Sequence, residues 1–137
     1  VQANAAPILT PSALAGVYSQ TLAVLSLSLI PVPLIVDSSS YLQGAVIRIS
    51  ANAGSNDFLE VSSSAAAAAS ITLSGNSTGV ITLSGQATVA QYQSVLNSLE
   101  FSGTLLNFNT RTIEFVTTDQ QGATSNTATL QLVVTLI

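Results

Sequence analysis

The chain has 137 residues, of which 47% are hydrophobic and only 6% are charged, against about a quarter charged in ordinary soluble domains. The length fits one domain. Two basic residues against six acidic ones give a net charge of −4, which excludes a basic patch for nucleic acid. The chain has no histidine and no cysteine, which excludes Ser-His-Asp and Cys-His centres, disulfides and thiolate metal sites.

The N-terminal third predicts a linker, strands and no membrane span. Residues 1–10 read as a linker followed by a first strand, and residues 11–20 as a turn or short helix. Alternation of leucine and serine predicts a strand over Thr21–Ile30. The apolar run Leu22–Val36 is too short for a membrane helix, and prolines interrupt it. We expect a processed protein or a fragment, because the first residue is valine and no signal peptide is visible.

The middle of the chain predicts further strands separated by polar turns. Leu34–Val36 resumes the sheet, and in the next strand Ala45, Ile47 and Ile49 alternate toward the core. Phe58 begins another strand after a loop. The serine and alanine run over residues 62–70 predicts a loop or a thin strand, because it has no amphipathic face.

Two copies of the letters ITLSG, at residues 71–75 and 81–85, predict a hairpin whose turn is Asn76-Ser77-Thr78-Gly79. This turn contains an N-glycosylation sequon at Asn76, which we expect to be exposed and modified if the protein is eukaryotic.

The C-terminal part gives the clearest elements. Thr88 and Gln91 form a capping box, and apolar residues at spacings of three and four predict one short helix at about residues 88–97. Strands follow over Arg111–Asp119 and from Ala128 onward, with a turn at residues 119–122. The whole predicts an all-β, two-sheet sandwich of about seven to eight strands with that single helix.

Several of these motifs resemble the cadherin-like or Ig-like tandem repeats of large extracellular surface proteins and adhesins, including dystroglycan-type cadherin-like modules. The resemblance spans Gly79–Val134 and is weaker at Leu34–Ser50. It implies that residues 11–137 form a single cadherin-like domain. The matching letters are Leu83-Ser84-Gly85, Ala87-Thr88-Val89-Ala90-Gln91-Tyr92-Gln93, Arg111-Thr112-Ile113, Thr118-Asp119 and Gly122-Ala123-Thr124-Ser125-Asn126-Thr127-Ala128-Thr129.

The same resemblance implies a calcium site at Asn4, Asp37 and Asp119, and calcium is the one cofactor we expect. The alternative is that Asp37 and Asp119 cap turns. The chain departs from the family at Val116-Thr117, where an apolar residue would stand at 117. A β-bulge or a strand apolar on both faces would explain the departure.

We predict from the sequence that the protein is not an enzyme. Asp57 and Glu60 are the nearest approach to a carboxylate pair, and we expect both to be solvated. We predict a structural or adhesive module of an extracellular filament or cell-surface array, with neighbouring copies or modules of the same protein as partners. Low charge favours such association, although sugar or adjacent domains could equally cover the surface. Sheet edges and the apolar N-terminal segment are the expected contacts, through Leu22, Val24, Leu25, Leu27, Leu29 and Ile30.

The alternative function is calcium-dependent adhesion or carbohydrate binding. Sugar-binding sites usually present exposed aromatic rings. The chain has no tryptophan, and Tyr92 belongs to the apolar face of the predicted helix. Tyr18 and Tyr41 are the remaining candidates.

Overall fold

The computed structural model describes residues 6–11, 13–20, 27–28, 32–37, 41–51, 57–76, 78–102 and 110–136, with the backbone alone for 13–20, 27–28, 51 and 134–136. Within these ranges the protein is mostly β, with several sheets and two helices, which is consistent with a β-sandwich.

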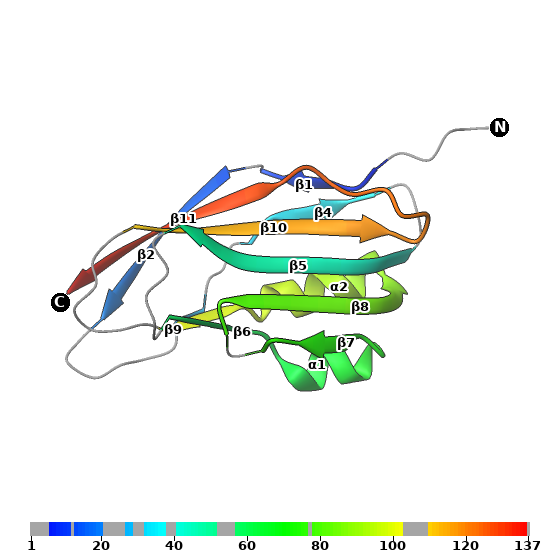
Figure 1. Cartoon of the computed structure of the whole chain (residues 1–137), viewed down its shortest axis with the longest axis horizontal. Coiled ribbons are helices and arrows are strands. Elements are labelled where there is room, and N and C mark those ends of the chain that lie inside the picture. Colours follow the sequence, from blue (N-terminus) through cyan, green and yellow to red (C-terminus); the bar gives the residue numbers. More distant parts are fainter. Residues whose placement is uncertain are drawn as a thin grey trace.

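The largest element is a six-stranded sheet that forms one layer of the molecule (Figure 1). The edge strand β2 (Ala13–Gln20) runs parallel to its neighbour β11 (Ala128–Leu136), and the other neighbours are antiparallel. In spatial order the strands are β2 (Ala13–Gln20), β11 (Ala128–Leu136), β10 (Arg111–Asp119), β5 (Tyr41–Ala51), β8 (Val80–Thr88) and β7 (Thr72–Ser74).

Two smaller sheets and the helices cover one face of the large sheet. The three-stranded sheet has the order β3 (Leu27–Ser28), β9 (Glu100–Ser102), β6 (Phe58–Glu60). The two-stranded sheet pairs β1 (Ile8–Thr10) with β4 (Leu34–Val36). Helices α1 (Ser63–Ala68) and α2 (Val89–Asn97) complete this layer (Figure 1). The core lies between the two layers.

Alternation along the long strands builds that core. In β10 every second side chain is buried, and Ile113 and Phe115 are at most 1% exposed. Ala45 and Ile47 of β5 are buried and Ile49 packs against them, as the sequence predicted. The large sheet therefore has one apolar face turned inward and one polar face turned outward.

Helix α2 confirms the predicted helix and its start. The Thr88 hydroxyl accepts a hydrogen bond from the Gln91 N–H at 3.1 Å, and the Gln91 side chain accepts one from the Thr88 N–H at 2.9 Å. Tyr92, Val95 and Leu96 are buried. The capping box begins the helix and its apolar stripe holds it against the large sheet.

Two predictions were wrong about local structure. Residues 62–70 contain α1 rather than a loop or thin strand, because the Ser62 hydroxyl caps the Ala65 N–H at 3.1 Å and Ala66 is buried. Residues 13–20 form β2 rather than a turn or short helix, because β11 supplies a complete parallel partner. Both segments owe their conformation to packing or pairing that short sequence windows do not contain.

The predicted count of seven to eight strands in two sheets was also wrong. The described residues form eleven strands in three sheets. Six of these strands, β1, β3, β4, β6, β7 and β9, have three residues or fewer. Such short strands leave little periodicity in a sequence.

Thr117 sits inside an otherwise apolar row of β10. It is 1% exposed, and the burial alternation continues through it without a break. The register shifts of β10 fall at Thr112/Ile113 and Thr118/Asp119. The expectation of a bulge or a doubly apolar strand at 116–117 was therefore wrong, since Thr117 simply occupies the inward position.

Candidate functional site

The residues predicted to bind calcium are only partly brought together. Asn4 lies outside the described residues. Asp37 follows β4 and Asp119 ends β10, and both strands end on the same side of the molecule (Figure 1). Asp119 is fully buried, and its Oδ1 accepts hydrogen bonds from the N–H groups of Gln121 at 2.9 Å and Ala123 at 3.0 Å. One oxygen of Asp119 thus shapes the β10–β11 turn.

Asp37 differs from Asp119, because its carboxylate holds no turn or strand through a hydrogen bond to the described residues. Both of its oxygens are shielded from solvent, and neither has a hydrogen-bond partner among the described residues. A shielded carboxylate without a partner is costly, and a cation would satisfy it. The described part of the chain contains no group of three or more acidic, histidine or cysteine side chains placed to hold a metal, whereas calcium takes six to eight oxygens. Asp37 therefore fits calcium only if carbonyls or water complete its shell.

Asp57 forms a buried ion pair with Arg111, and the expectation that it is solvated was wrong. The Arg111 Nε donates to Oδ2 at 2.7 Å and Nη2 donates to Oδ1 at 3.1 Å, with both side chains fully buried. The guanidinium carbon lies 5.8 Å from the centre of the Phe101 ring. Because Asp57 precedes β6 and Arg111 begins β10, the pair links the three-stranded sheet to the large sheet.

Glu60 does not join Asp57. It is exposed on β6, where Glu100 of β9 lies directly opposite. These two glutamates line a shallow polar concavity of about 530 Å³ with serines 62, 63 and 98. The three-stranded sheet therefore carries negative charge on its outer side.

Asn76 occupies the predicted hairpin turn, yet its amide is engaged. Its Oδ1 accepts from the Val61 N–H at 2.9 Å, and its Nδ2 donates to the Val61 carbonyl at 3.2 Å. The residue is half-buried. A glycan on Nδ2 would compete with the hydrogen bond to the Val61 carbonyl. Modification of Asn76 therefore stays a prediction, and it would disturb this contact.

Amide side chains also close the edges of the two-stranded sheet. The Leu9 N–H donates to Asn126 Oδ1 at 2.9 Å, and Asn126 Nδ2 donates to the Leu9 carbonyl at 3.2 Å. On the other edge, Gln93 accepts from the Ile35 N–H at 2.7 Å and donates to the Pro33 carbonyl at 3.2 Å. These amides take the place of neighbouring strands, so further strands cannot pair there without displacing them.

The outer face of this small sheet is apolar. Ile8 is 52% exposed, Leu34 56% and Val36 47%. Ile8 and Val36 are directly paired, and Leu34 lies two residues from Val36 on the same face. We call Ile8, Leu34 and Val36 the aliphatic patch. In the sequence, Ile8 precedes the segment predicted to self-associate, and Leu34 and Val36 follow it.

Most of that predicted segment cannot be compared with the structure. Leu22, Val24, Leu25, Leu29 and Ile30 lie outside the described residues, as does the Leu27 side chain. The backbone of Leu27 pairs with Phe101 in the three-stranded sheet.

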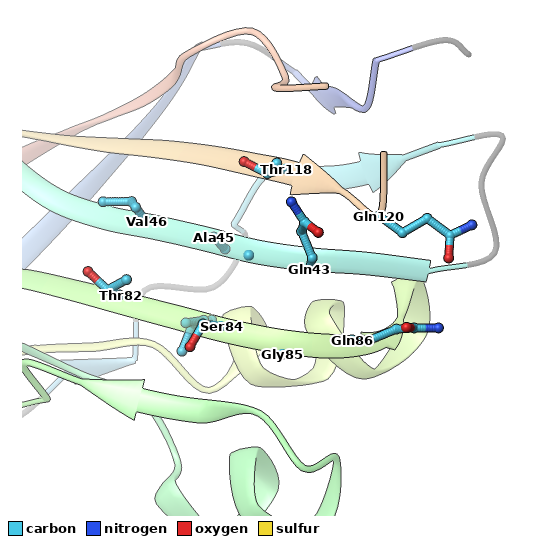
Figure 2. Close-up of a pocket in the computed structure, with 11 residues that line it drawn as sticks. Gln43, Ala45, Val46, Thr82, Ser84, Gly85, Gln86, Thr118 and Gln120 are labelled. Carbon is cyan, nitrogen blue, oxygen red and sulfur yellow. The ribbon is translucent and has the colours of Figure 1, made fainter. Parts of the chain in front are cut away.

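The outer face of the large sheet is broad, polar and nearly free of charge. At one end it forms a shallow concavity of about 500 Å³. Figure 2 shows Gln43, Gln86 and Gln120 at this end and Thr82 and Val46 further along the strands. Among the described residues, the only charged side chains on this face are Arg48 and Glu114, which pair with each other at 2.7 Å.

The tyrosines give little support to a sugar platform. Tyr92 is fully buried, and its hydroxyl donates to the Gly85 carbonyl at 2.6 Å. Burial raises the pKa of Tyr92 to about 12. Tyr41 is 39% exposed at the start of β5, and the Tyr18 side chain is outside the described residues.

Comparison with protein-family models, curated proteins and solved structures found no match. The resemblance to cadherin-like repeats therefore stays a prediction. Neither helix in the described ranges is long and apolar enough to cross a membrane.

Proposed function

We propose that this chain is a non-catalytic, cadherin-like or Ig-like structural module of an extracellular filament or surface array, and that copies or neighbouring modules associate through its apolar N-terminal region and sheet edges. The aliphatic patch is the observation that carries this proposal. Three large aliphatic side chains, each about half exposed, lie together on a sheet of only two strands.

The patch supports contact through a face rather than through the edges beside it. Asn126 and Gln93 already bond the outward backbone groups of Leu9, Pro33 and Ile35. Covering the exposed half of each aliphatic side chain contributes about 1 kcal/mol, or roughly 3 kcal/mol in all. Edge pairing would instead use β2 or β7, which end the large sheet.

The test is the oligomeric state of the whole chain. Sedimentation velocity over a range of concentrations should show assembly of the wild type. Leu34→Thr combined with Val36→Thr should weaken that assembly at least about thirtyfold, since roughly 2 kcal/mol of apolar contact is removed from each copy. Ala68→Thr, on an exposed position of α1, is the matched control and should assemble normally. Unchanged assembly of the double variant would refute the role of the patch.

Calcium-dependent adhesion is the second candidate, and the shielded Asp37 carboxylate favours it. A cation there would raise the melting temperature, because ligands that bind the folded state stabilise it. Calcium titration against EDTA, with Asp37→Asn as the comparison, decides the question. A wild-type melting temperature that does not respond to millimolar calcium would exclude this candidate.

A further inference from the structure

We infer that the outer face of the six-stranded sheet is a second contact surface, at which another copy of this chain packs face to face. This inference rests on the proposed self-association and adds to it a second interface on a different surface. We call Val46, Thr82, Ser84 and Val116, with Gln43 and Gln86 at one end and the Arg48–Glu114 pair at the other, the sheet face.

Charge distribution favours a copy of the same chain as the occupant. Of the eight charged residues, Arg111 and Asp57 are buried together, and Arg48 and Glu114 neutralise each other on the sheet face. The remaining four carboxylates account for the net charge of −4. Two of them, Glu60 and Glu100, lie on the three-stranded sheet, and the other two follow or end β4 and β10. Two identical surfaces repel when they carry net charge, so the neutral sheet face is the broad surface best suited to meet its own copy.

The composition of the sheet face follows the pattern of protein interfaces. Val46 and Val116 are directly paired across β5 and β10, and Thr82 lies opposite Val46 on β8. The centre therefore presents methyl groups of β-branched side chains. Glutamine, serine and threonine lie around it, with the glutamines at one end (Figure 2). The Arg48–Glu114 ion pair lies two residues along β5 and β10 on the other side. Charged groups are depleted in the centres of interfaces, and polar residues form the rim.

The area is sufficient for a stable contact. The five long strands of the sheet, about 4.8 Å apart and about 30 Å long, give it a face of roughly 700 Å². Two copies would then bury about 1,400 Å² in total, within the range of about 1,200–2,000 Å² typical of specific interfaces. Two twisted sheets of this kind pack with their strand directions about 30° apart.

The two surfaces point in opposite directions, and this determines the form of the assembly. Leu9 and Ile35 turn inward from the small sheet toward the core, so the aliphatic patch faces away from the large sheet. The sheet face is turned outward on the other layer (Figure 1). A subunit with one self-complementary contact stops at a dimer. A subunit with two such contacts on opposite sides continues into a filament.

Substitution at each surface separately tests the inference. Thr82→Lys places a charge at the centre of the sheet face. It should weaken that contact at least tenfold, because both copies then bring a lysine into the contact and the two positive charges repel each other. Ser84→Lys repeats the test at an independent exposed position. Ala68→Lys adds the same charge on α1, outside both surfaces. Far-UV circular dichroism and melting curves establish that each variant is folded.

Sedimentation velocity and electron microscopy give the readout. The wild type and Ala68→Lys should form filaments, the Thr82→Lys and Leu34→Thr/Val36→Thr variants should each stop at dimers, and their combination should be monomeric. Filaments of folded Thr82→Lys and Ser84→Lys like those of the wild type would overturn the inference and leave the aliphatic patch untouched. Monomers of the patch variant would also overturn it. If the patch variant forms the same filaments as the wild type while Thr82→Lys forms dimers, only the role of the aliphatic patch is refuted. A wild type that stays monomeric would overturn both proposals.

Discussion

Breaking the buried pair between Arg111 and Asp57 should cost far more stability than breaking the exposed pair between Arg48 and Glu114. The chain has only these two basic residues, and both take part in an ion pair of 2.7 Å. The first pair is fully buried, whereas the Arg48 and Glu114 side chains are 54% and 24% exposed. The chain therefore contains its own matched control for the effect of burial.

The magnitudes follow from solvation. Arg111→Met leaves the Asp57 carboxylate buried without its guanidinium, and Asp57→Leu leaves the guanidinium without its carboxylate. Either change should lower the free energy of unfolding by about 3–5 kcal/mol. A domain of this length has roughly 7–20 kcal/mol in total. The double variant should lose less than either single variant, because no uncompensated charge remains and the cation–π contact with Phe101 adds only about 1 kcal/mol. Arg48→Met and Glu114→Leu should each cost less than about 1 kcal/mol.

Urea titrations followed by far-UV circular dichroism measure all of these values, and urea leaves the ionic strength unchanged. The coupling energy is the difference between the double variant and the sum of the single variants. If the double variant of the buried pair loses a free energy of unfolding equal to that sum within about 0.5 kcal/mol, Arg111 and Asp57 are not coupled. If the variants of the exposed Arg48–Glu114 pair lose as much stability as those of the buried pair, burial is not the reason for the large loss.

Three further outcomes follow from local geometry. Burial raises the pKa of Tyr92 to about 12, so the folded protein favours the neutral phenol. The free energy of unfolding should therefore be unaffected below about pH 10 and should fall by about 3 kcal/mol as the pH rises from 10 to 12. Urea titrations of Tyr92→Phe should show a smaller loss over that window. Gly75 has φ +76°, and a Cβ there would lie 2.2 Å from the Val80 carbonyl oxygen, so Gly75→Ala should cost at least about 2 kcal/mol, whereas Gly79→Ala, which meets nothing within 4 Å, should change the urea midpoint little. Thr88→Ala removes the helix cap and should cost about 1 kcal/mol, and Thr88→Ser should restore most of it in the same assay.

The elements predicted correctly are those with long periodic patterns. The strand over Arg111–Asp119 and the helix over about 88–97 have the same bounds in the structure to within a residue. The ITLSG repeat does form the antiparallel pair β7–β8. Each of these segments contains enough turns or alternations for its own sequence to determine its conformation.

The elements predicted wrongly depend on partners distant in the sequence. β2 becomes a strand because β11, more than a hundred residues later, pairs with its whole length. Helix α1 has one buried alanine and no apolar stripe, so only its alanine content and its serine cap favoured a helix. The pairing of β1 with β4 likewise joins residues that no short window contains.

The candidate sites show the same limit more strongly. Asp57 and Arg111 are 54 positions apart, and nothing in either local sequence signals that the two side chains meet. The aliphatic patch joins Ile8 to Val36 across the same kind of distance. The contacts named from the sequence lie between Leu22 and Ile30, so the sequence did not identify the patch. Its outward orientation follows from the pairing of β1 with β4, in which alternate residues face the core.

One part of the sequence that resembles cadherin-like repeats, Asp119–Asn126, has structural roles in this fold. Asp119 accepts two turn N–H groups, and Gly122 has φ +88°, which favours glycine. The Ser125 hydroxyl accepts from the Thr117 N–H at 2.9 Å, and Asn126 closes the edge of β1 at Leu9. Because Asp119, Ser125 and Asn126 serve a turn and an edge, this stretch is informative about architecture. The same stretch says little about a ligand. The function must therefore be sought on the surfaces outside it, where the aliphatic patch and the neutral sheet face distinguish this chain from a domain that merely folds.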